Sequence, residues 1–247
     1  MLRIIVLSAV LVIGLCTHVP MAVAAMSSAE AKQLAAEAGH GNAHALAQLQ
    51  TRAGAGDAVA QKAMGDLYRH GHGVRRDDAA AASWYRRAAG QGLAAAQAEL
   101  GFLYYTGHGV RRDYAKAATW WRKAARQGDA SAQANLGVLY YKGQGVAQDY
   151  AMAAKLWLGA AEQGDASSQY NIGFAYYKGQ GVPRDDVEAY KWLSLAAAHR
   201  SSGGLHDAAT ATRDAVAQQM TQEQLASARQ LLKAWHPKLY GRSGGKL

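Results

Sequence analysis

Apolar and small residues recur at helical spacing through the middle of this chain, in blocks separated by glycine-rich loops. In one block Leu136 and Leu139 share a side, and Gly143 follows them. After a short loop, Ala153 and Trp157 mark a second apolar side. Because residues three and four positions apart lie on one side of a helix, the segment predicts two amphipathic helices joined by a tight turn.

This helix pair occurs four times with a period of 36 residues and no insertion or deletion. The copies span residues 56–91, 92–127, 128–163 and 164–199. Three columns are identical in every copy: Gln61, Gln97, Gln133 and Gln169; Gly65, Gly101, Gly137 and Gly173; and Tyr68, Tyr104, Tyr140 and Tyr176. A fixed period of this length is typical of stacked repeats. The sequence therefore predicts an all-α fold, a right-handed α-solenoid of antiparallel helix pairs.

Aspartates precede most of the predicted helices. A side-chain carboxylate there can accept hydrogen bonds from the free backbone N–H groups of the first turn. The column before the second helix is Asp77, Asp113, Asp149 and Asp185, and the column before the first helix is Asp57, Leu93, Asp129 and Asp165. Repeat 2 therefore lacks one cap, which costs about 1 kcal/mol.

The invariant glycine inside each first helix needs a packing reason, because glycine there costs about 0.5–1 kcal/mol relative to alanine. Two neighbouring columns of the second helix are rich in aromatic residues: Trp84, Trp120, Leu156 and Trp192, and Tyr85, Trp121, Trp157 and Leu193. We expect these aromatic side chains to press against the glycines of the first helices.

The repeat resembles the Sel1-like repeat, a tetratricopeptide-like helical unit. The resemblance is carried by the run Ala132-Gln133-Ala134-Asn135-Leu136-Gly137-Val138-Leu139-Tyr140-Tyr141, by Gly143-Gln144-Gly145-Val146, and by Gln163-Gly164. It covers residues 56–199 and implies a solenoid whose first helices line a concave surface.

Atypical helices are expected at both ends of the array, because the last units of a stack must cover an exposed seam. The N-terminal capping region is 26–55, with helices near 28–38 and 42–52; the C-terminal one is 200–240, with helices near 206–219 and 222–234. Residues 241–247 are predicted to be a flexible tail.

The first 25 residues have the pattern of a secretion signal: Arg3, an apolar run over 4–16, and Ala22-Val23-Ala24. The run is shorter than the roughly 20 residues that span a bilayer. We expect cleavage after Ala24 or Ala25 and a periplasmic or secreted bacterial protein; an uncleaved membrane anchor is the alternative. Cleavage would remove Cys16, the single cysteine, and with it any disulfide or thiolate chemistry.

The net charge of +9 is uneven. Repeat 2 carries +4 and residues 200–247 carry another +4. Arg75, Arg76, Arg111 and Arg112 lie in loops one repeat apart. Two interpretations are open: a basic patch for anionic cell-envelope groups, or solvated arginines that contribute little.

The side of the first helices opposite the invariant columns varies between copies and is aromatic in repeats 2 to 4. The candidate binding residues are Phe102, Tyr105, Tyr141, Lys142, Tyr170, Phe174, Tyr177 and Lys178. Aromatic side chains beside cations suit a partner helix or an extended peptide with a carboxylate. The alternative is that Tyr105, Tyr141 and Tyr177 only cover the loop after each first helix.

Catalytic and metal-binding patterns are weak. His70, His72 and His108 have no carboxylate or cysteine to complete a ligand set. Some secreted, cysteine-rich relatives are linked to β-lactam binding or hydrolysis, but the Ser-x-x-Lys spacing of such enzymes occurs here only at Ser243 and Lys246, in the glycine-rich tail. We therefore predict no enzymatic activity, metal or cofactor. The expected protein is a monomeric adaptor that binds an unidentified protein or peptide and no nucleic acid.

Overall fold

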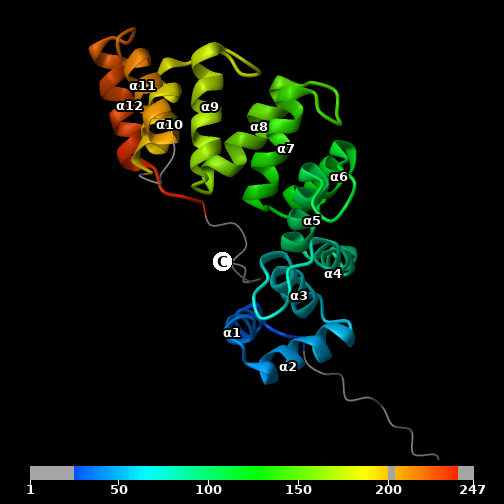
Figure 1. The fold of residues 1–247 in the computed structure, drawn as a ribbon. Coiled ribbons are helices and arrows are strands. Elements are labelled where there is room, and N and C mark those ends of the chain that lie inside the picture. Colours follow the sequence, from blue (N-terminus) through cyan, green and yellow to red (C-terminus); the bar gives the residue numbers. More distant parts are fainter. Residues whose placement is uncertain (1–24, 200–203, 239–247) are drawn as a thin grey trace, which may run out of the picture.

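The computed structural model describes residues 25–199 and 204–238. These residues form twelve helices and no strand, packed as antiparallel pairs along a curved array (Figure 1). The helices are α1 (Ser28–Gly39), α2 (Ala43–Gly54), α3 (Ala58–His70), α4 (Asp78–Gly90), α5 (Ala94–Thr106), α6 (Tyr114–Arg126), α7 (Ala130–Lys142), α8 (Tyr150–Glu162), α9 (Ala166–Lys178), α10 (Asp186–Ala198), α11 (Leu205–Ala217) and α12 (Gln222–Ala234). The predicted helical solenoid is confirmed. Almost all of the predicted signal segment, and the tail 241–247, lie outside the described residues.

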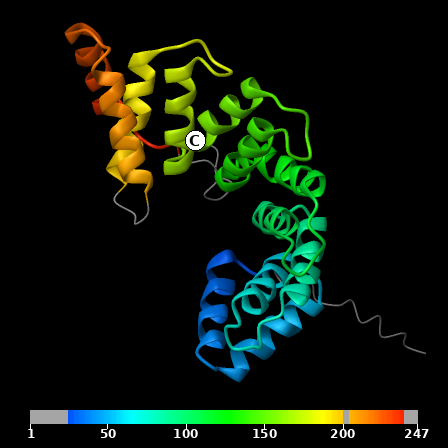
Figure 2. The same cartoon turned by 45° about the horizontal axis from the view of Figure 1, so that its top comes forward.

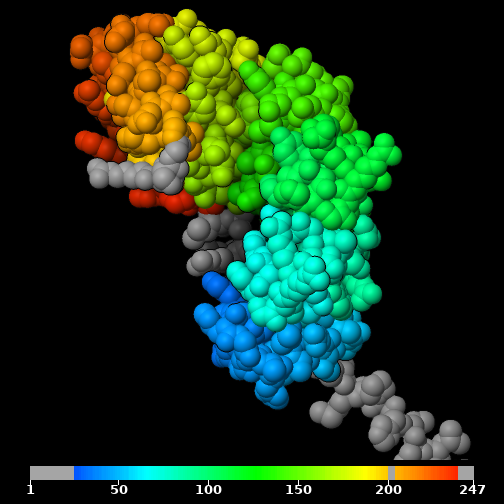
Figure 3. Space-filling view, viewed as in Figure 1, coloured from blue at the N-terminus to red at the C-terminus, as the bar shows by residue number. Residues whose placement is uncertain are grey.

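The curve has an inner and an outer side. In Figure 1, α1 and α3 lie toward the hollow, whereas α4 and α6 lie on the outer side. Figure 2 shows the same curve from a second direction. In the space-filling view the N-terminal helices and repeat 4 lie at separate ends, joined by the middle repeats (Figure 3). The helices at the two ends, α1 and α12, therefore lack the neighbouring repeat that helices inside the array have on both sides.

Polar caps begin the helices as predicted. The carboxylate of Asp149 accepts a hydrogen bond from the backbone N–H of Met152 at 2.9 Å, and the other aspartates of its column act in the same way. Leu93 makes no side-chain cap. Each first helix of the four repeats ends at a glycine in the left-handed conformation, such as Gly143 with φ of 65°. The sharp turn between paired helices follows from this residue.

The hydrophobic core is a seam between successive repeats. One cluster joins Ala81, Tyr85 and Ala88 of α4 to Leu100 and Leu103 of α5. Equivalent clusters join α6 to α7 and α8 to α9. Each repeat thus buries its apolar surface against the next one, as stacked repeats require.

Three of the four mid-helix glycines receive a ring from the paired helix, and Gly173 receives the side chain of Leu193 instead. A Cβ atom on Gly65 would lie 2.5 Å from Cε1 of Tyr85, and one on Gly101 would lie 2.5 Å from Cδ1 of Trp121. The indole Nε1 of Trp121 also donates a hydrogen bond to the carbonyl of Ala98 at 3.0 Å. The glycines therefore allow a close approach that any larger residue would block.

The expectation was wrong for the neighbouring aromatic column. Trp84, Trp120 and Trp192 pack into the seam clusters that join their own repeat to the preceding helix pair. Adjacent positions on a helix point about 100° apart, so only one of two neighbouring columns can face the paired first helix. The other column faces the previous repeat.

Buried glutamines link the repeats. The Nε2 group of Gln97 donates to the carbonyl of Ala89 at 3.2 Å, and its Oε1 accepts from Nε2 of Gln127 at 2.9 Å. In repeat 4 the residue equivalent to Gln127 is His199, and Oε1 of Gln169 has no hydrogen-bond partner within the described part of the chain. The glutamine Oε1 atom is therefore hydrogen-bonded in Gln97, inside the array, and unpaired in Gln169, in the last repeat.

Gln97→Met should lower the free energy of unfolding by about 1–3 kcal/mol, because it leaves the buried carbonyl of Ala89 unpaired and removes one of the two acceptors of the Gln127 amide. Gln169→Met should cost less, since its Oε1 is already unpaired. Urea denaturation of both variants checks this; an equal loss in the two would contradict the role assigned to the link.

The segment after α12 returns along the array. The ring centroid of Trp235 lies 6.4 Å from that of Trp192. The backbone N–H of Lys238 donates to the carbonyl of Glu162 at 2.6 Å, and its Nζ lies 2.8 Å from the same residue's carboxylate. The segment therefore fastens the C-terminal helices to α8 and satisfies one of the free carbonyls at the end of that helix.

Candidate functional site

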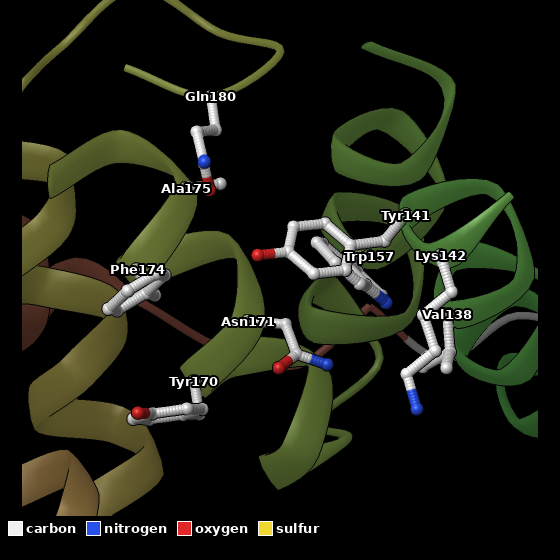
Figure 4. A pocket seen from close by; sticks show the side chains of 9 residues that line it. All are labelled: Val138, Tyr141, Lys142, Trp157, Tyr170, Asn171, Phe174, Ala175 and Gln180. Carbon is white, nitrogen blue, oxygen red and sulfur yellow. The ribbon is translucent and has the colours of Figure 1, made fainter. Parts of the chain in front are cut away.

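A cavity of about 330 Å³ opens between α7 and α9, the first helices of repeats 3 and 4. Helix α7 supplies Val138, Tyr141 and Lys142, α9 supplies Tyr170, Asn171, Phe174 and Ala175, and Trp157 of α8 and Gln180 complete the lining (Figure 4). The volume is in the range of small ligand pockets and of hollows that take a single side chain.

Two pairs of rings form the walls. The ring of Tyr141 lies 5.4 Å from Trp157 on one side and 5.3 Å from Tyr150 on the other, measured between centroids. Tyr170 and Phe174, one turn apart on α9, stack at 6.3 Å with 26° between their planes. Because these rings support one another, the walls are formed before any ligand binds.

The cavity exists because repeat 4 departs from the other repeats at one core position. The column Leu67, Leu103 and Leu139 continues as Ala175. The three leucines are almost completely buried, and Ala175 is 3% exposed and lines the cavity. Alanine lacks most of the volume of a leucine side chain, so we attribute part of the cavity to this substitution.

Polar groups around the cavity are free to meet a ligand. No hydrogen bond or ion pair within the described residues engages the side chains of Lys142 or Asn171. The Oε1 atom of Gln180 is buried without a partner there. Figure 4 shows the amide of Asn171 between the two aromatic walls and the amine of Lys142 at one edge. The site therefore offers a cation and an amide beside an apolar hollow.

Four of the predicted binding residues meet in this cavity, namely Tyr141, Lys142, Tyr170 and Phe174. Tyr177 lies outside it, where Nε2 of Gln219 donates to its hydroxyl at 3.2 Å. The amine of Lys178 lies over the rings of Phe174 and Tyr177, at 5.7 and 4.5 Å.

Phe102 and Tyr105 lie one repeat away on α5. Arg69 sits 4.7 Å over the ring of Phe102, and Tyr105 packs against Tyr114 and Trp121 at 5.4 and 5.5 Å. Their part in binding stays a prediction.

Sequence reasoning missed Asn171, Gln180 and Ala175. A signal was present for Asn171 and Ala175. Asn171 has an identical counterpart at Asn135, and Ala175 breaks a leucine column. Trp157 was assigned to the core alone, whereas its indole both fills the seam and lines the cavity.

At repeat 1 the same face also has a cavity, of about 440 Å³, but charged side chains line it in place of aromatic rings. Lys62 pairs with Asp66 at 2.7 Å, and Arg69 pairs with Glu99. The hydroxyl of Tyr85 donates to Asp66 at 2.7 Å. Burial, and then the charge of Asp66, raise the pKa of the Tyr85 hydroxyl above its usual range. Open aromatic surface is thus a property of the C-terminal half of the face.

The described residues contain no group of three potential metal ligands. His70 and His72 stack on one another with ring centroids 5.5 Å apart. Among the helices of the described ranges, none combines the length and the apolar character that crossing a bilayer needs.

Four consecutive matches to the Sel1 repeat model cover residues 58–93, 94–129, 130–165 and 166–201. The chain belongs to the Sel1 repeat family. Proteins of this family are generally non-enzymatic scaffolds for protein–protein interaction. The matched units keep the 36-residue period and begin two residues later than the units defined above.

Solved structures support the same fold. A Sel1 repeat protein from Oxalobacter formigenes is 32% identical, with a TM-score of 0.64 over 71% of each chain. The protein c5321, a protective antigen of uropathogenic Escherichia coli with an SLR fold, is 26% identical, with a TM-score of 0.52; the match covers 89% of this chain and 58% of that one. No curated protein matches the chain significantly.

Proposed function

We propose that this Sel1 repeat protein is an exported, non-enzymatic scaffold that binds an extended peptide segment of a partner protein between α7 and α9. The observation that carries the proposal is the cavity at Ala175, which has aromatic walls and unengaged polar groups at its edge. A buried hollow of this kind suits one anchoring side chain, which is how small interfaces gain most of their binding energy.

Each part of the site has a role in this proposal. Tyr141 and Phe174 enclose an apolar side chain of the peptide, and the amide of Asn171 donates to and accepts from its backbone. Lys142 attracts a neighbouring carboxylate. Asn135 occupies the equivalent position one repeat away.

Export rests on the sequence of the first 25 residues. Expression of the full chain in a bacterium, followed by fractionation and intact-mass measurement, tests it. A mature form that begins at Ala25 or Met26 in the periplasmic fraction supports export. A full-length protein that stays in the cytoplasm contradicts it and leaves the binding proposal to be tested separately.

The binding site has its own test. Tyr141→Ala combined with Phe174→Ala should weaken capture of a crosslinked partner at least about 30-fold, which corresponds to a hot-spot loss of about 2 kcal/mol. Leu231→Ala on α12 is the matched control, because Leu231 is an exposed apolar residue far along the chain from the cavity. Circular dichroism melts verify folding. If the folded double variant captured the partner as well as the control did, the cavity would not be the binding site.

A further inference from the structure

A second surface, separate from the cavity, is strongly basic. It lies on the second helices of repeats 1 and 2, where Arg86 and Arg87 of α4 and Lys123 and Arg126 of α6 are all exposed. In Figure 1 these two helices are on the outer side of the curve. We call the group formed by Arg75, Arg86, Arg87, Arg111, Arg112, Lys123 and Arg126 the outer basic face.

The charges of this face are not neutralised within the protein. Within residues 25–199 and 204–238, no hydrogen bond or ion pair engages the side chains of Arg75, Arg86, Arg111 or Arg126. Arg87, Arg112 and Lys123 lie over aromatic rings instead of beside acids; their partners are Trp84 at 4.7 Å, Tyr114 at 5.6 Å and Trp120 at 4.4 Å. A cation on the face of a ring keeps its charge and is held in place.

The cations form rows because the repeats place them in register. Arg87 and Lys123 occupy the same position one repeat apart, as do Arg86 and Arg122. Trp120 of α6 packs against the cluster that contains residues of α4, so the two helices lie close together. Arg126 extends the row by one turn along α6. The helix cations therefore form a row from one repeat to the next near the C-terminal ends of α4 and α6, and Arg75, Arg111 and Arg112 lie in the loops before these helices begin.

Stacking of the repeats does not require these cations. In repeat 3 the positions of Arg86 and Arg87 hold Leu158 and Gly159, and in repeat 4 they hold Ser194 and Leu195. The loop arginine of repeat 4, Arg184, pairs with Asp186, as its counterpart Arg76 in repeat 1 pairs with Asp78, and neither belongs to the outer basic face. The fold is the same in all four repeats, so the unpaired charge of repeats 1 and 2 serves something other than the fold.

We infer that the outer basic face binds an acidic segment of a polypeptide. Most of its cations are arginines, whose planar guanidinium groups match the two oxygens of a carboxylate. Trp84 and Trp120 are only half-buried beside them and offer apolar surface to the side chains between the acids. An outward-curving surface meets a flat bilayer at few points, whereas a flexible acidic chain can follow it.

The test uses the full chain and a fluorescent Glu-rich peptide that also contains leucine. The wild type should bind this probe at low salt and release it as ionic strength rises. The variant Arg86→Gln, Arg87→Gln, Lys123→Gln should bind at least about tenfold more weakly. The control Lys155→Gln, Arg229→Gln, Lys233→Gln removes the same charge from exposed positions elsewhere and should stay within about twofold of the wild type.

Three outcomes would overturn the inference. One is equal loss in the two triple variants, which would mean that net charge alone acts. Another is binding to phosphatidylglycerol vesicles or duplex DNA without binding to the peptide. The third is loss of peptide binding in Phe174→Ala, which would place the acidic ligand in the cavity instead. Retention of binding in Phe174→Ala together with its loss in the Arg86, Arg87, Lys123 variant supports a second surface.

Discussion

Gly137→Leu is expected to lower the free energy of unfolding by about 3 kcal/mol, although leucine is the better helix former. A Cβ atom at position 137 would lie 2.5 Å from Nε1 and 2.7 Å from Cδ1 of Trp157. The indole is buried, and its Nε1 donates to the carbonyl of Ala134 at 3.3 Å. The ring therefore cannot move aside without breaking that bond and the seam beside it, and overpacking of this kind is costly. Chemical denaturation measures the loss.

The control for this prediction is another helical glycine. Gly90 lies at the end of α4, and a Cβ there would meet no atom within 4 Å. Gly90→Ala should leave stability unchanged or raise it by about 0.5–1 kcal/mol, because alanine restricts the unfolded chain more than glycine does. If Gly137→Leu melted like the wild type, the role given to the mid-helix glycines would be wrong.

Gly109→Ala should also cost about 3 kcal/mol or more, for a different reason. Gly109 has a φ of 68°, and a Cβ on it would lie 2.6 Å from the backbone nitrogen of Ala79 in the preceding repeat and still closer to the carbonyl of Asp78. The loop of one repeat thus rests directly on the second helix of the previous one. A side chain there combines an unfavourable backbone conformation with separation of the two repeats.

Gly92→Ala separates these two contributions. Gly92 has a φ of 92°, but a Cβ on it would meet no atom within 4 Å. It should show only the conformational cost, about 1–2 kcal/mol. The excess loss in Gly109→Ala then measures the contact between repeats. Equal losses in the two variants would show that the loop does not couple one repeat to the next.

The sequence was sufficient for the array because identical columns report what every repeat needs. The buried glutamines, the helix caps and the glycine turns could be assigned from repetition alone. The packing of Trp84 and Trp120 could not be predicted, because side chains of either aromatic column could pack against the mid-helix glycines. Only the orientation of the second helix decides which column faces them. Repetition shows which residues every repeat needs for stacking, but it does not show which side chains they pack against.

The candidate site was harder to predict for the opposite reason. It depends on positions where repeat 4 differs from the others. The aromatic residues Tyr141 and Phe174 could be predicted from their variable columns. The site also depends on the small side chain of Ala175 and on the unpaired amide of Asn171. A smaller side chain leaves a cavity only if the facing helix does not fill the space, and this can be seen only in the folded structure.

The variant Ala175→Leu decides whether the cavity binds a peptide, because it restores the leucine found in repeats 1 to 3 and should fill the cavity without disturbing the fold. Peptides selected on the wild-type protein from a displayed random library would be titrated against both proteins by calorimetry. We expect the variant to be at least as stable as the wild type and to bind the selected peptides at least about tenfold more weakly. Unchanged affinity in the stable variant, or a wild type that selects no peptide at all, would contradict it.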